Sequence, residues 1–296
     1  MEKTDLMNGL SEAESVLGGF VRLVDCMPRY CDEGQTADHA VCRSARVSYD
    51  GHNQSGRSAK AERGLIRYLM RHRHTSPFEM VEFTFHVKVP IFIARQWMRH
   101  RTGSFNEISA RYSVIGKDFH LPSPSEMGLQ STDNKQGRDE SGLSHGQAVS
   151  MLFAMESNMV QSQAQYERLL GQGLARELAR TILPVATYTE FYWKVDLLNL
   201  LKFLHLRMDK HAQYEIRLYA QSIAKIVERI APWSYEAFME YWVGAPSISS
   251  TEWAAISSVL TAEQKTEIVD LLNGFVSERE LKALSEAMRM AGGEDE

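Results

Sequence analysis

The sequence has 296 residues, of which 44% are hydrophobic and 24% are charged, as in an ordinary soluble globular protein. The formal net charge of -5 argues against a protein that binds nucleic acid over its whole surface, but it permits a basic pocket for an anionic metabolite. The N-terminus is acidic where a secretory signal would be basic, and no uninterrupted apolar stretch approaches about eighteen residues. We therefore expect a cytoplasmic protein without a membrane span.

The three cysteines are Cys26, Cys31 and Cys42, an odd number in one short region. A disulfide framework is therefore not expected, and reduced thiols in a cytoplasm are the simpler interpretation. A metal site built from all three is a weaker alternative, because no CxxC spacing supports it. We expect no metal site.

Hydrophobic periodicity in the first half of the chain predicts two strands and two helices. Residues 20–26 alternate as a strand does, and residues 62–73 carry apolar side chains at helical spacing. Residues 81–89 alternate strictly between apolar and polar, which predicts a strand with one buried face. Pro90 can then occupy the first position of a helix that continues through residue 100.

The second half begins with residues 122–147, which are rich in Ser, Gly, Asp, Asn and Pro and predict a long surface loop. Helices are then expected over about 147–170, 174–183 (ended by Pro184), 197–207 and 211–230 (ended by Pro232), with a strand over 185–195. Asp196 is a suitable N-cap for the third of these helices. Strands interleaved among long helices, without a regular βαβ rhythm, predict an α+β fold.

The character of the chain changes near Ala245, so we expect a catalytic domain over residues 1–245 and a small helical extension over 246–296. Three capping-box patterns predict helix starts in the extension, at Ser249/Glu252, Thr261/Gln264 and Ser277/Glu280. The last residues, GGEDE, are expected to be frayed. We expect the extension to serve packing or assembly.

Polar chemistry is concentrated in residues 95–113, at a predicted helix-to-loop junction. Within these nineteen residues lie four arginines, a histidine, a carboxylate and three serines: Arg95, Arg99, Arg101, Arg111, His100, Glu107, Ser104, Ser109 and Ser113. The planar guanidinium group binds two phosphate oxygens at once, so this set suits a nucleotide. The alternative is a solvated basic turn with incidental ion pairs.

Two further sets of cations have weaker signals on their own. Residues 71–79 (RHRHTSPFE) end one predicted helix, where cations also simply complement the helix dipole. Arg176 with Arg180, and Arg207 with His211, lie one helical turn apart. Arg207 follows a very apolar run and must find an anion, a carbonyl or water, which a structural salt bridge would provide equally well.

Several mechanisms lack their sequence signatures. The chain has no GxGxxG, GxxxxGK[ST], HExxH or GxSxG pattern. No cysteine lies in the arginine-rich segments, so a thiolate nucleophile has no obvious candidate there.

Residues 99–113 (RHRTGSFNEISARYS) resemble the RHRxxSxNExSxR motif of the flavin-dependent thymidylate synthases at every specified position. Other segments agree in the family's order: ARVSY (45–49), HTSPFE (74–79), ARTILP (179–184) and LRMDKHAQYEIR (206–217). The resemblance covers roughly residues 20–243. It implies an α/β domain with an antiparallel-rich sheet, a homotetramer whose active sites are shared between subunits, and FAD bound in a groove between them.

The resemblance also assigns site residues. It places FAD against His74, Ser76, Glu79, Arg99, His100, Arg101 and Glu107, and also against Asp196, Leu198 and Lys202, where some family members carry asparagine and arginine. It places dUMP against Gln96, Arg99, Glu107, Ser109, Ala110, Arg111, Arg180 and Arg207. No general base is evident beside Ser109, so a binding role is favoured over a nucleophilic one.

The activity that the resemblance implies is reductive methylation of dUMP to dTMP, with 5,10-methylenetetrahydrofolate as carbon donor and NADPH, through FAD, as hydride source. Arg207 is the expected catalytic residue, because a cation beside the uracil ring favours its ionised form. A flavoenzyme that transfers no carbon, such as an NADPH oxidase-like protein, is one alternative. A nucleic-acid-binding module that uses the RHR segments is another, and it would bind DNA or RNA with strong salt dependence.

Overall fold

A computed structural model describes residues 3–47, 58–139, 142–272 and 278–290. The chain divides into two compact units, Met1–Met239 and Glu240–Glu296. The strands are β1 (Lys3–Asp5), β2 (Glu14–Val16), β3 (Gly19–Met27), β4 (Tyr30–Asp32), β5 (Glu82–Pro90), β6 (Ser104–Glu107), β7 (Leu129–Gln130), β8 (Arg138–Asp139) and β9 (Tyr188–Asp196). The helices of the first unit are α1 (Asp38–Ala45), α2 (Ala59–Arg71), α3 (Ile91–Trp97), α4 (His145–Gly171), α5 (Arg176–Ala179), α6 (Leu197–Arg207), α7 (Tyr214–Ile230) and α8 (Pro232–Phe238), with 3₁₀ turns η1 (Ser76–Met80), η2 (Pro124–Glu126) and η3 (Arg180–Ile182).

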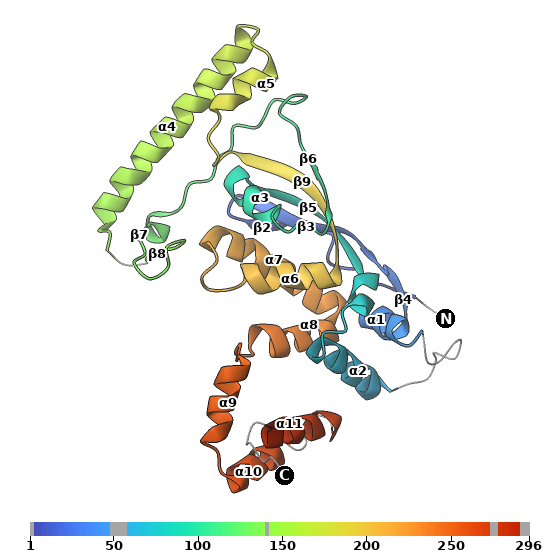
Figure 1. Cartoon of the computed structure of the whole chain (residues 1–296). Coiled ribbons are helices and arrows are strands. Elements are labelled where there is room, and N and C mark those ends of the chain that lie inside the picture. The colour runs from blue at the N-terminus through green and yellow to red at the C-terminus, as the bar shows by residue number, and fades with distance from the viewer. Residues whose placement is uncertain (1–2, 48–57, 140–141, 273–277, 291–296) are drawn as a thin grey trace. The chain divides into compact units, whose positions relative to one another are not determined.

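The first unit is built on a five-stranded sheet with the order β2-β3-β5-β9-β6, in which every neighbouring pair is antiparallel. The long central pair, β5 with β9, runs in register from Glu82 opposite Asp196 to Pro90 opposite Tyr188. Helices α3, α6 and α7 pack against the sheet (Figure 1). The predicted α+β class with an antiparallel-rich sheet is confirmed.

The core lies between this sheet and its helices. The apolar side chains that alternate along β5 are fully buried, as predicted: Phe83, Phe85, Val87 and Val89. Aromatic rings connect the layers, since Trp97 of α3 makes edge-to-face contact with Trp193 of β9 and stacks on Phe203 of α6. Leucines of α6 are buried in this core, and their packing fixes the position of the whole helix.

Several predicted boundaries require correction. Pro90 is the N-cap of α3 and not its first residue, and α3 ends at Trp97. The helix predicted over 174–183 is the short α5 followed by the 3₁₀ turn η3. Pro232 was expected to end a helix, and it is also the first residue of the next helix, α8. Asp196 is confirmed as the N-cap of α6, since its side chain accepts a hydrogen bond from the Asn199 N–H.

The largest correction concerns residues 104–107, which were expected to be loop and form the edge strand β6. Four residues with only one large apolar side chain give too short a pattern to identify a strand. The strand exists because β9 supplies its hydrogen-bonding partner and because Phe105 stacks on Trp193 of that strand. Tertiary pairing therefore overrides the local preference for loop.

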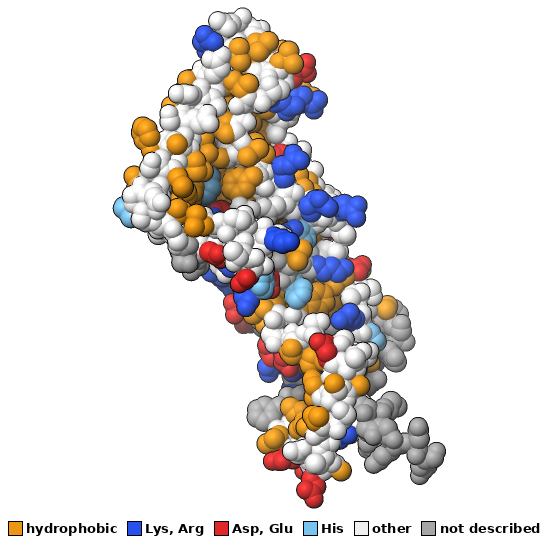
Figure 2. All heavy atoms as spheres, turned by 60° about the vertical axis from the view of Figure 1, so that its left-hand side comes forward, with side chains coloured by type: hydrophobic (Ala, Val, Ile, Leu, Met, Phe, Trp, Pro, Cys, Tyr) orange, Lys and Arg blue, Asp and Glu red, His pale blue; other side chains and the backbone are white. Residues whose placement is uncertain are grey.

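Helix α4 is longer than any other helix of the described chain and projects beyond the sheet (Figure 1). It begins with a capping box between Ser144 and Gln147. Hydrophobic side chains gather on the upper part of the face shown in Figure 2, where α4 lies. Those of Val149, Met151, Phe153 and Val160 are exposed, with Phe153 at 72%. This is an unusually apolar surface for a helix in water.

The second unit contains α9 (Ser250–Ser258), α10 (Ala262–Leu272) and α11 (Glu278–Met290), and the π-helical turn η4 (Met239–Val243) joins it to the first. Capping hydrogen bonds at Ser249/Glu252 and at Thr261/Gln264 confirm two of the three predicted helix starts. Ser277, Ser48, Tyr49 and the GGEDE terminus lie outside the described residues. Within the described ranges, no helix combines the length and apolar character that crossing a membrane requires.

Candidate active site

The candidate catalytic residue, Arg207, is the last residue of α6. Leu197, Leu200 and Leu204 are buried in the core, and α6 ends where its sequence turns polar. Two hydrogen bonds anchor the guanidinium group to the end of α3 and the turn after it. Arg207 Nε donates to His100 Nε2 at 3.0 Å, and Arg207 Nη2 donates to the carbonyl oxygen of Gln96 at 3.3 Å. The fold thus joins the end of α6 to the RHR segment.

Burial determines the charge state of this cluster. Burial and, to a smaller extent, the neighbouring Arg207 cation together lower the pKa of His100 to about 4. His100 is therefore neutral at pH 7, and because its Nε2 accepts from Arg207, the proton resides on Nδ1. Burial and the nearby Arg99 also lower the pKa of Arg207, which remains charged because arginine starts far above neutrality.

Arg207 has no anionic partner in the described part of the chain. Its two contacts are with a neutral imidazole and a peptide carbonyl, and no described carboxylate forms an ion pair with it. A half-buried cation without a counter-ion has lost hydration that it does not regain within the chain. The cluster is therefore suited to receive an anionic ligand.

Gln96 links this cluster to the start of α7. Its side-chain Nε2 donates a hydrogen bond to Oε1 of Gln213, the residue before α7, while its backbone carbonyl accepts from Arg207. Residue 213 was not among the predicted site residues. Its only signal in the sequence was its place within the LRMDKHAQYEIR segment.

The motif residues after Arg101 lie along β6 and the loop that follows. Glu107 Oε1 accepts a 2.6 Å hydrogen bond from the hydroxyl of Thr189 on β9, a partner that no local pattern indicated. Ser109 Oγ accepts from the backbone N–H and from Nε of Arg111, both at 3.3 Å. Ala110 is buried, whereas the Arg111 side chain is exposed over the ring of Tyr112.

The predicted substrate arginine of the later helix, Arg180, lies in η3 and is exposed. Its neighbour Arg176 donates to the carbonyl oxygen of Tyr112 at 3.4 Å, so α5 lies against the loop after β6. Among the described residues, no hydrogen bond or ion pair joins Arg111 or Arg180 to the Arg207 cluster. The single chain brings these two arginines to the surface and not to the cluster.

His74, Ser76 and Glu79 lie in and just before η1, and all three side chains are exposed. The turn η1 packs against α6, and the backbone N–H of Leu197, the first residue of α6, donates to the carbonyl of Val81 at 2.7 Å. These residues therefore lie at the N-terminal end of α6, whereas Arg207 lies at its C-terminal end. Helix α6 has 11 residues and is about 16 Å long, so the two groups lie at its opposite ends.

Of the three residues that depart from the family pattern, Asp196 and Leu198 lie at the same N-terminal end, and Lys202 lies in the middle of α6. The Asp196 carboxylate is engaged by both the backbone N–H and the side-chain amide of Asn199. Leu198 is 3% exposed and belongs to the core. Lys202 is exposed, with a 3.4 Å contact to Asn199 Oδ1, and is the one of the three whose charged group faces solvent.

The three cysteines are free, buried and outside the arginine-rich cluster. Burial raises the pKa of Cys26 and of Cys42 to about 12, and raises that of Cys31. At neutral pH these thiols are protonated and weakly nucleophilic. The described residues also contain no group of three or more His, Cys, Asp or Glu side chains placed to hold a metal ion.

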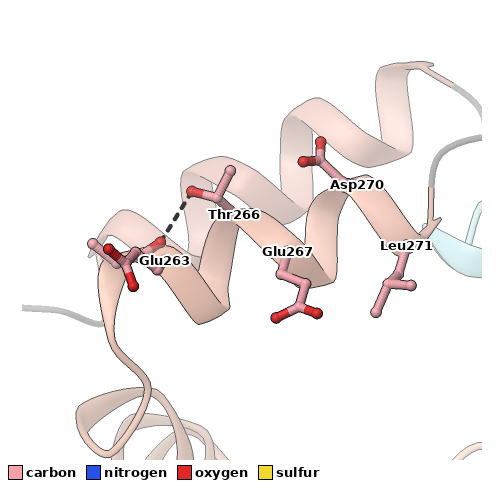
Figure 3. A pocket seen from close by; sticks show the side chains of 6 residues that line it. Glu263, Thr266, Glu267, Asp270 and Leu271 are labelled. Carbon is pink, nitrogen blue, oxygen red and sulfur yellow. Dashed lines mark hydrogen bonds between the residues drawn. The ribbon is translucent and has the colours of Figure 1, made fainter.

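A surface depression on α10 of the second unit is a poor candidate for the same chemistry. It has a volume of about 660 Å³. Figure 3 shows its labelled side chains along one helix, including Glu263, Glu267 and Asp270. None of the described residues that line it is basic. Three carboxylates would repel an anionic ligand, which leaves the arginine cluster of the first unit as the candidate active site.

An antiparallel α+β fold that carries a guanidinium cluster is typical of a protein that binds an anionic ligand such as a nucleotide. The family model described as "Thymidylate synthase complementing protein" matches residues 24–233. Flavin-dependent thymidylate synthases are similar to this chain in Ruegeria pomeroyi (45% identical over 253 residues, 84% of this chain and 80% of the relative) and in Dictyostelium discoideum (47% over 272 residues, 90% and 88%).

Solved structures agree with this comparison. The UMP/dUMP methylase PolB from Streptomyces cacaoi, bound with 5-Br dUMP, has 37% sequence identity and a TM-score of 0.66, covering 76% of this chain and 96% of that one. The chain belongs to the thymidylate synthase complementing protein family, and is an enzyme of the flavin-dependent thymidylate synthase class.

Proposed function

We propose that this enzyme reductively methylates dUMP to dTMP in the cytoplasm, with 5,10-methylenetetrahydrofolate as carbon donor and NADPH as reductant through FAD. The observation that carries the proposal is the half-buried Arg207 guanidinium, held by His100 and Gln96 and without a carboxylate partner in the described chain. The names of the similar proteins and the 5-Br dUMP in the PolB structure support the substrate.

Arg207 would activate the pyrimidine. A cation beside the uracil carbonyl and N3 lowers the pKa of the ring, because it favours the ionised form. Charge delocalised into the ring makes C5 nucleophilic toward the folate methylene group. The buried apolar face of α6 limits solvent beside Arg207, so the interaction is screened less than it would be in water.

This activation would replace the addition of an enzyme thiol to C6. The protonated, buried cysteines support an electrostatic mechanism, since none is available as a thiolate at neutral pH. Neutral His100 contributes by orienting Arg207 without adding a further positive charge to those of Arg207 and Arg99.

The remaining substrate contacts would come from more than one subunit. In our proposal dUMP lies against Gln96, Arg99, Glu107, Ser109, Ala110, Arg111, Arg180 and Arg207. The exposure of Arg111 and Arg180 in the single chain supports a site completed by neighbouring copies. The apolar, exposed side chains of α4 support burial of that helix in a homotetramer, because such a surface is costly in water.

The residues proposed for FAD have a donor set that fits a dinucleotide. The exposed cations Arg99 and Arg101 suit its diphosphate, and Lys202 suits a phosphate or ring oxygen. His74, Ser76, Glu79, His100 and Glu107 would supply further polar contacts. Asp196 and Leu198 would contribute through the backbone, because one side chain caps α6 and the other is in the core. When bound, FAD reduced by NADPH supplies the hydride that completes the methyl group.

The direct test is release of tritium from [5-³H]dUMP by the purified, FAD-loaded protein. Release should require both methylenetetrahydrofolate and NADPH, and dTMP should form in equal amount. The protein should be yellow, and NADPH should bleach it. NADPH oxidation without tritium release would indicate instead a flavoenzyme that transfers no carbon, and a colourless protein with salt-dependent affinity for DNA would indicate the nucleic-acid-binding alternative.

The same assay should include UMP, because the similar PolB structures carry 5-Br dUMP in one case and 5-Br UMP in the other. We expect dUMP to be preferred, since the relatives of higher identity are thymidylate synthases. If UMP is turned over as fast as dUMP, the enzyme accepts both ribonucleotide and deoxyribonucleotide substrates.

A further inference from the structure

A second cavity, of about 770 Å³, lies in the first unit between the β7–β8 hairpin and the start of α7. Its volume is within the range of small-molecule sites. Three cationic side chains from three separate segments line it: Arg138 of β8, Lys210 of the turn after α6, and Arg217 of α7. None of them belongs to the residues proposed above for dUMP or FAD.

Two of these cations are held rigidly around one aromatic ring. The guanidinium carbons of Arg138 and Arg217 lie 5.2 and 5.6 Å from the ring centre of Tyr214. Arg138 Nη1 also pairs with the buried Glu215 carboxylate at 2.9 Å, and Arg217 Nη1 donates to the carbonyl of Lys210 at 3.0 Å. Fixed cations lose less conformational entropy on binding a ligand than mobile ones do.

The third cation, Lys210, lies close enough to Asp209 to lower the pKa of that carboxylate. The Lys210 side chain is exposed and makes no hydrogen bond or ion pair with a described residue. Two acids, Glu126 and Asp139, also line the cavity, but Glu126 is engaged at 2.6 Å by the backbone N–H of Ser123, where it caps η2. Three cationic side chains therefore line the cavity against two carboxylates, and one of the three, Arg138, is already paired with Glu215.

The N-terminus of α7 adds to this positive potential. Its N-cap residue, Gln213, makes no side-chain capping hydrogen bond, because its side-chain oxygen accepts from Gln96 instead. Gln213 and Tyr214 line the cavity, so the positive end of a 17-residue helix opens on it. Two hydrogen bonds, Gln213 to Gln96 and Gln96 to Arg207, connect the cavity with the candidate catalytic residue.

We propose that this cavity binds the anionic end of the reaction's second organic substrate, through the cations Arg138, Lys210 and Arg217. This proposal rests on the proposed function. The shared chemistry is a carboxylate or phosphate group, which the γ-glutamyl tail of the folate and the phosphates of NADPH both carry. dUMP is not the occupant that we propose, because Arg138, Lys210 and Arg217 are not among the residues proposed for it.

Binding of isolated anionic fragments tests the proposal without relying on turnover. The full-length, FAD-loaded protein is titrated by calorimetry with adenosine 2′,5′-bisphosphate, for NADPH, and with tri-γ-glutamate, for the folate tail. Lys210→Glu and Arg217→Gln should each raise the Kd of the probe that binds by about tenfold or more, equivalent to about 1.4 kcal/mol. Lys60→Glu, at an exposed lysine of α2, is the matched charge control and should leave binding unchanged.

The two probes distinguish the two sources. Loss of bisphosphate binding, with a raised KM for NADPH but not for NADH, assigns the cavity to the dinucleotide. Loss of glutamate binding, with a raised KM for polyglutamylated but not monoglutamylated folate, assigns it to the folate. The KM for dUMP should not change in either case.

Failure of this inference is distinguishable from failure of the proposed function. If wild-type protein releases tritium from dUMP but binds neither probe, or binds one equally well in both variants, the cavity is not an anion site. If wild-type protein releases no tritium, the proposed function itself is wrong. Thermal unfolding of both variants, checked against wild type, separates lost binding from lost folding.

Discussion

Arg207 and His100 lie 107 positions apart in the sequence and are joined by a 3.0 Å hydrogen bond from Nε to Nε2. The contact sets the orientation of the guanidinium group and the tautomer of the imidazole together. It also makes the end of α6 and the RHR segment one structural unit. A change at either residue should therefore be felt at the other.

Replacing Arg207 with alanine should remove dTMP formation while leaving FAD largely bound, since of the proposed flavin contacts only His100 loses a hydrogen-bond partner. The residue lies at the opposite end of α6 from His74, Ser76 and Glu79, so the flavin contacts proposed there remain. Loss of a charge aimed at the reacting ring should lower kcat by about 100-fold or more. Tritium release and the flavin spectrum measure the two effects separately. Arg229→Ala, at a surface arginine of α7, is the control, and near-normal turnover of Arg207→Ala would refute the assignment.

Protein stability should depend on His100 in acid. Its pKa is lowered in the folded state to about 4, against about 6.5 unfolded, so the unfolded chain binds more protons between these pH values. The free energy of unfolding should therefore fall as pH decreases from about 6.5 toward 4. His100→Gln should remove this component, as measured by urea unfolding at several pH values. His145→Gln, which changes an exposed histidine, is the control and should keep the pH dependence. An unchanged pH dependence of the free energy of unfolding in His100→Gln would contradict the expectation.

Alkylation should spare the native enzyme. Cys26, Cys31 and Cys42 are buried, and burial holds their pKa values above the usual range. Iodoacetamide at pH 8 should leave tritium release unchanged, and mass spectrometry should find carbamidomethyl groups only after unfolding. Loss of activity in parallel with labelling of one cysteine in the folded protein would instead point to a thiol in the reaction.

Gly103→Ala should disturb the turn that carries the RHR segment into β6. Gly103 has φ +155°, and an added Cβ would lie 2.9 Å from the Lys194 carbonyl and 2.9 Å from Trp193 Nε1. We expect a loss of about 1–3 kcal/mol in the free energy of unfolding, with weaker FAD retention. Gly64→Ala is the matched control, because its Cβ meets nothing within 4 Å in α2 and should stabilise the helix by about 0.5–1 kcal/mol. Equal stability of the two variants would contradict this.

Asp38 should be a strong determinant of stability outside the site. Its carboxylate is fully buried and accepts hydrogen bonds from the N–H groups of Trp233 and Ser234 and from the Ser234 hydroxyl, at 2.8, 2.9 and 2.6 Å. Asp38→Ala leaves these donors without an acceptor and should cost about 3–5 kcal/mol in urea unfolding. Asp38→Asn keeps one oxygen and should cost less. If both variants lower the free energy of unfolding by the same amount, the hydrogen bonds from Trp233 and Ser234 are not the cause of the loss.

The sequence by itself determined the features that are set by local pattern. The strict alternation over 81–89 predicted β5 and its buried face, because a strand places successive side chains on opposite faces. The capping residues Asp196 and Ser249 predicted helix starts, because a side-chain oxygen satisfies N–H groups only a few positions away. The arginine-rich motif likewise identified the family, since its spacing is contained in one segment.

Only the tertiary structure decided which of these segments meet. β6 is a strand because β9 lies beside it, and neither its length nor its composition indicates pairing. The partnership of Arg207 with His100, and that of Gln96 with Gln213, join positions about a hundred residues apart, and hydrogen bonds of this range leave no periodicity in the chain. The sequence lists the charged groups, but their burial, and hence the neutral His100 and the uncompensated Arg207, follows from how the helices pack on the sheet.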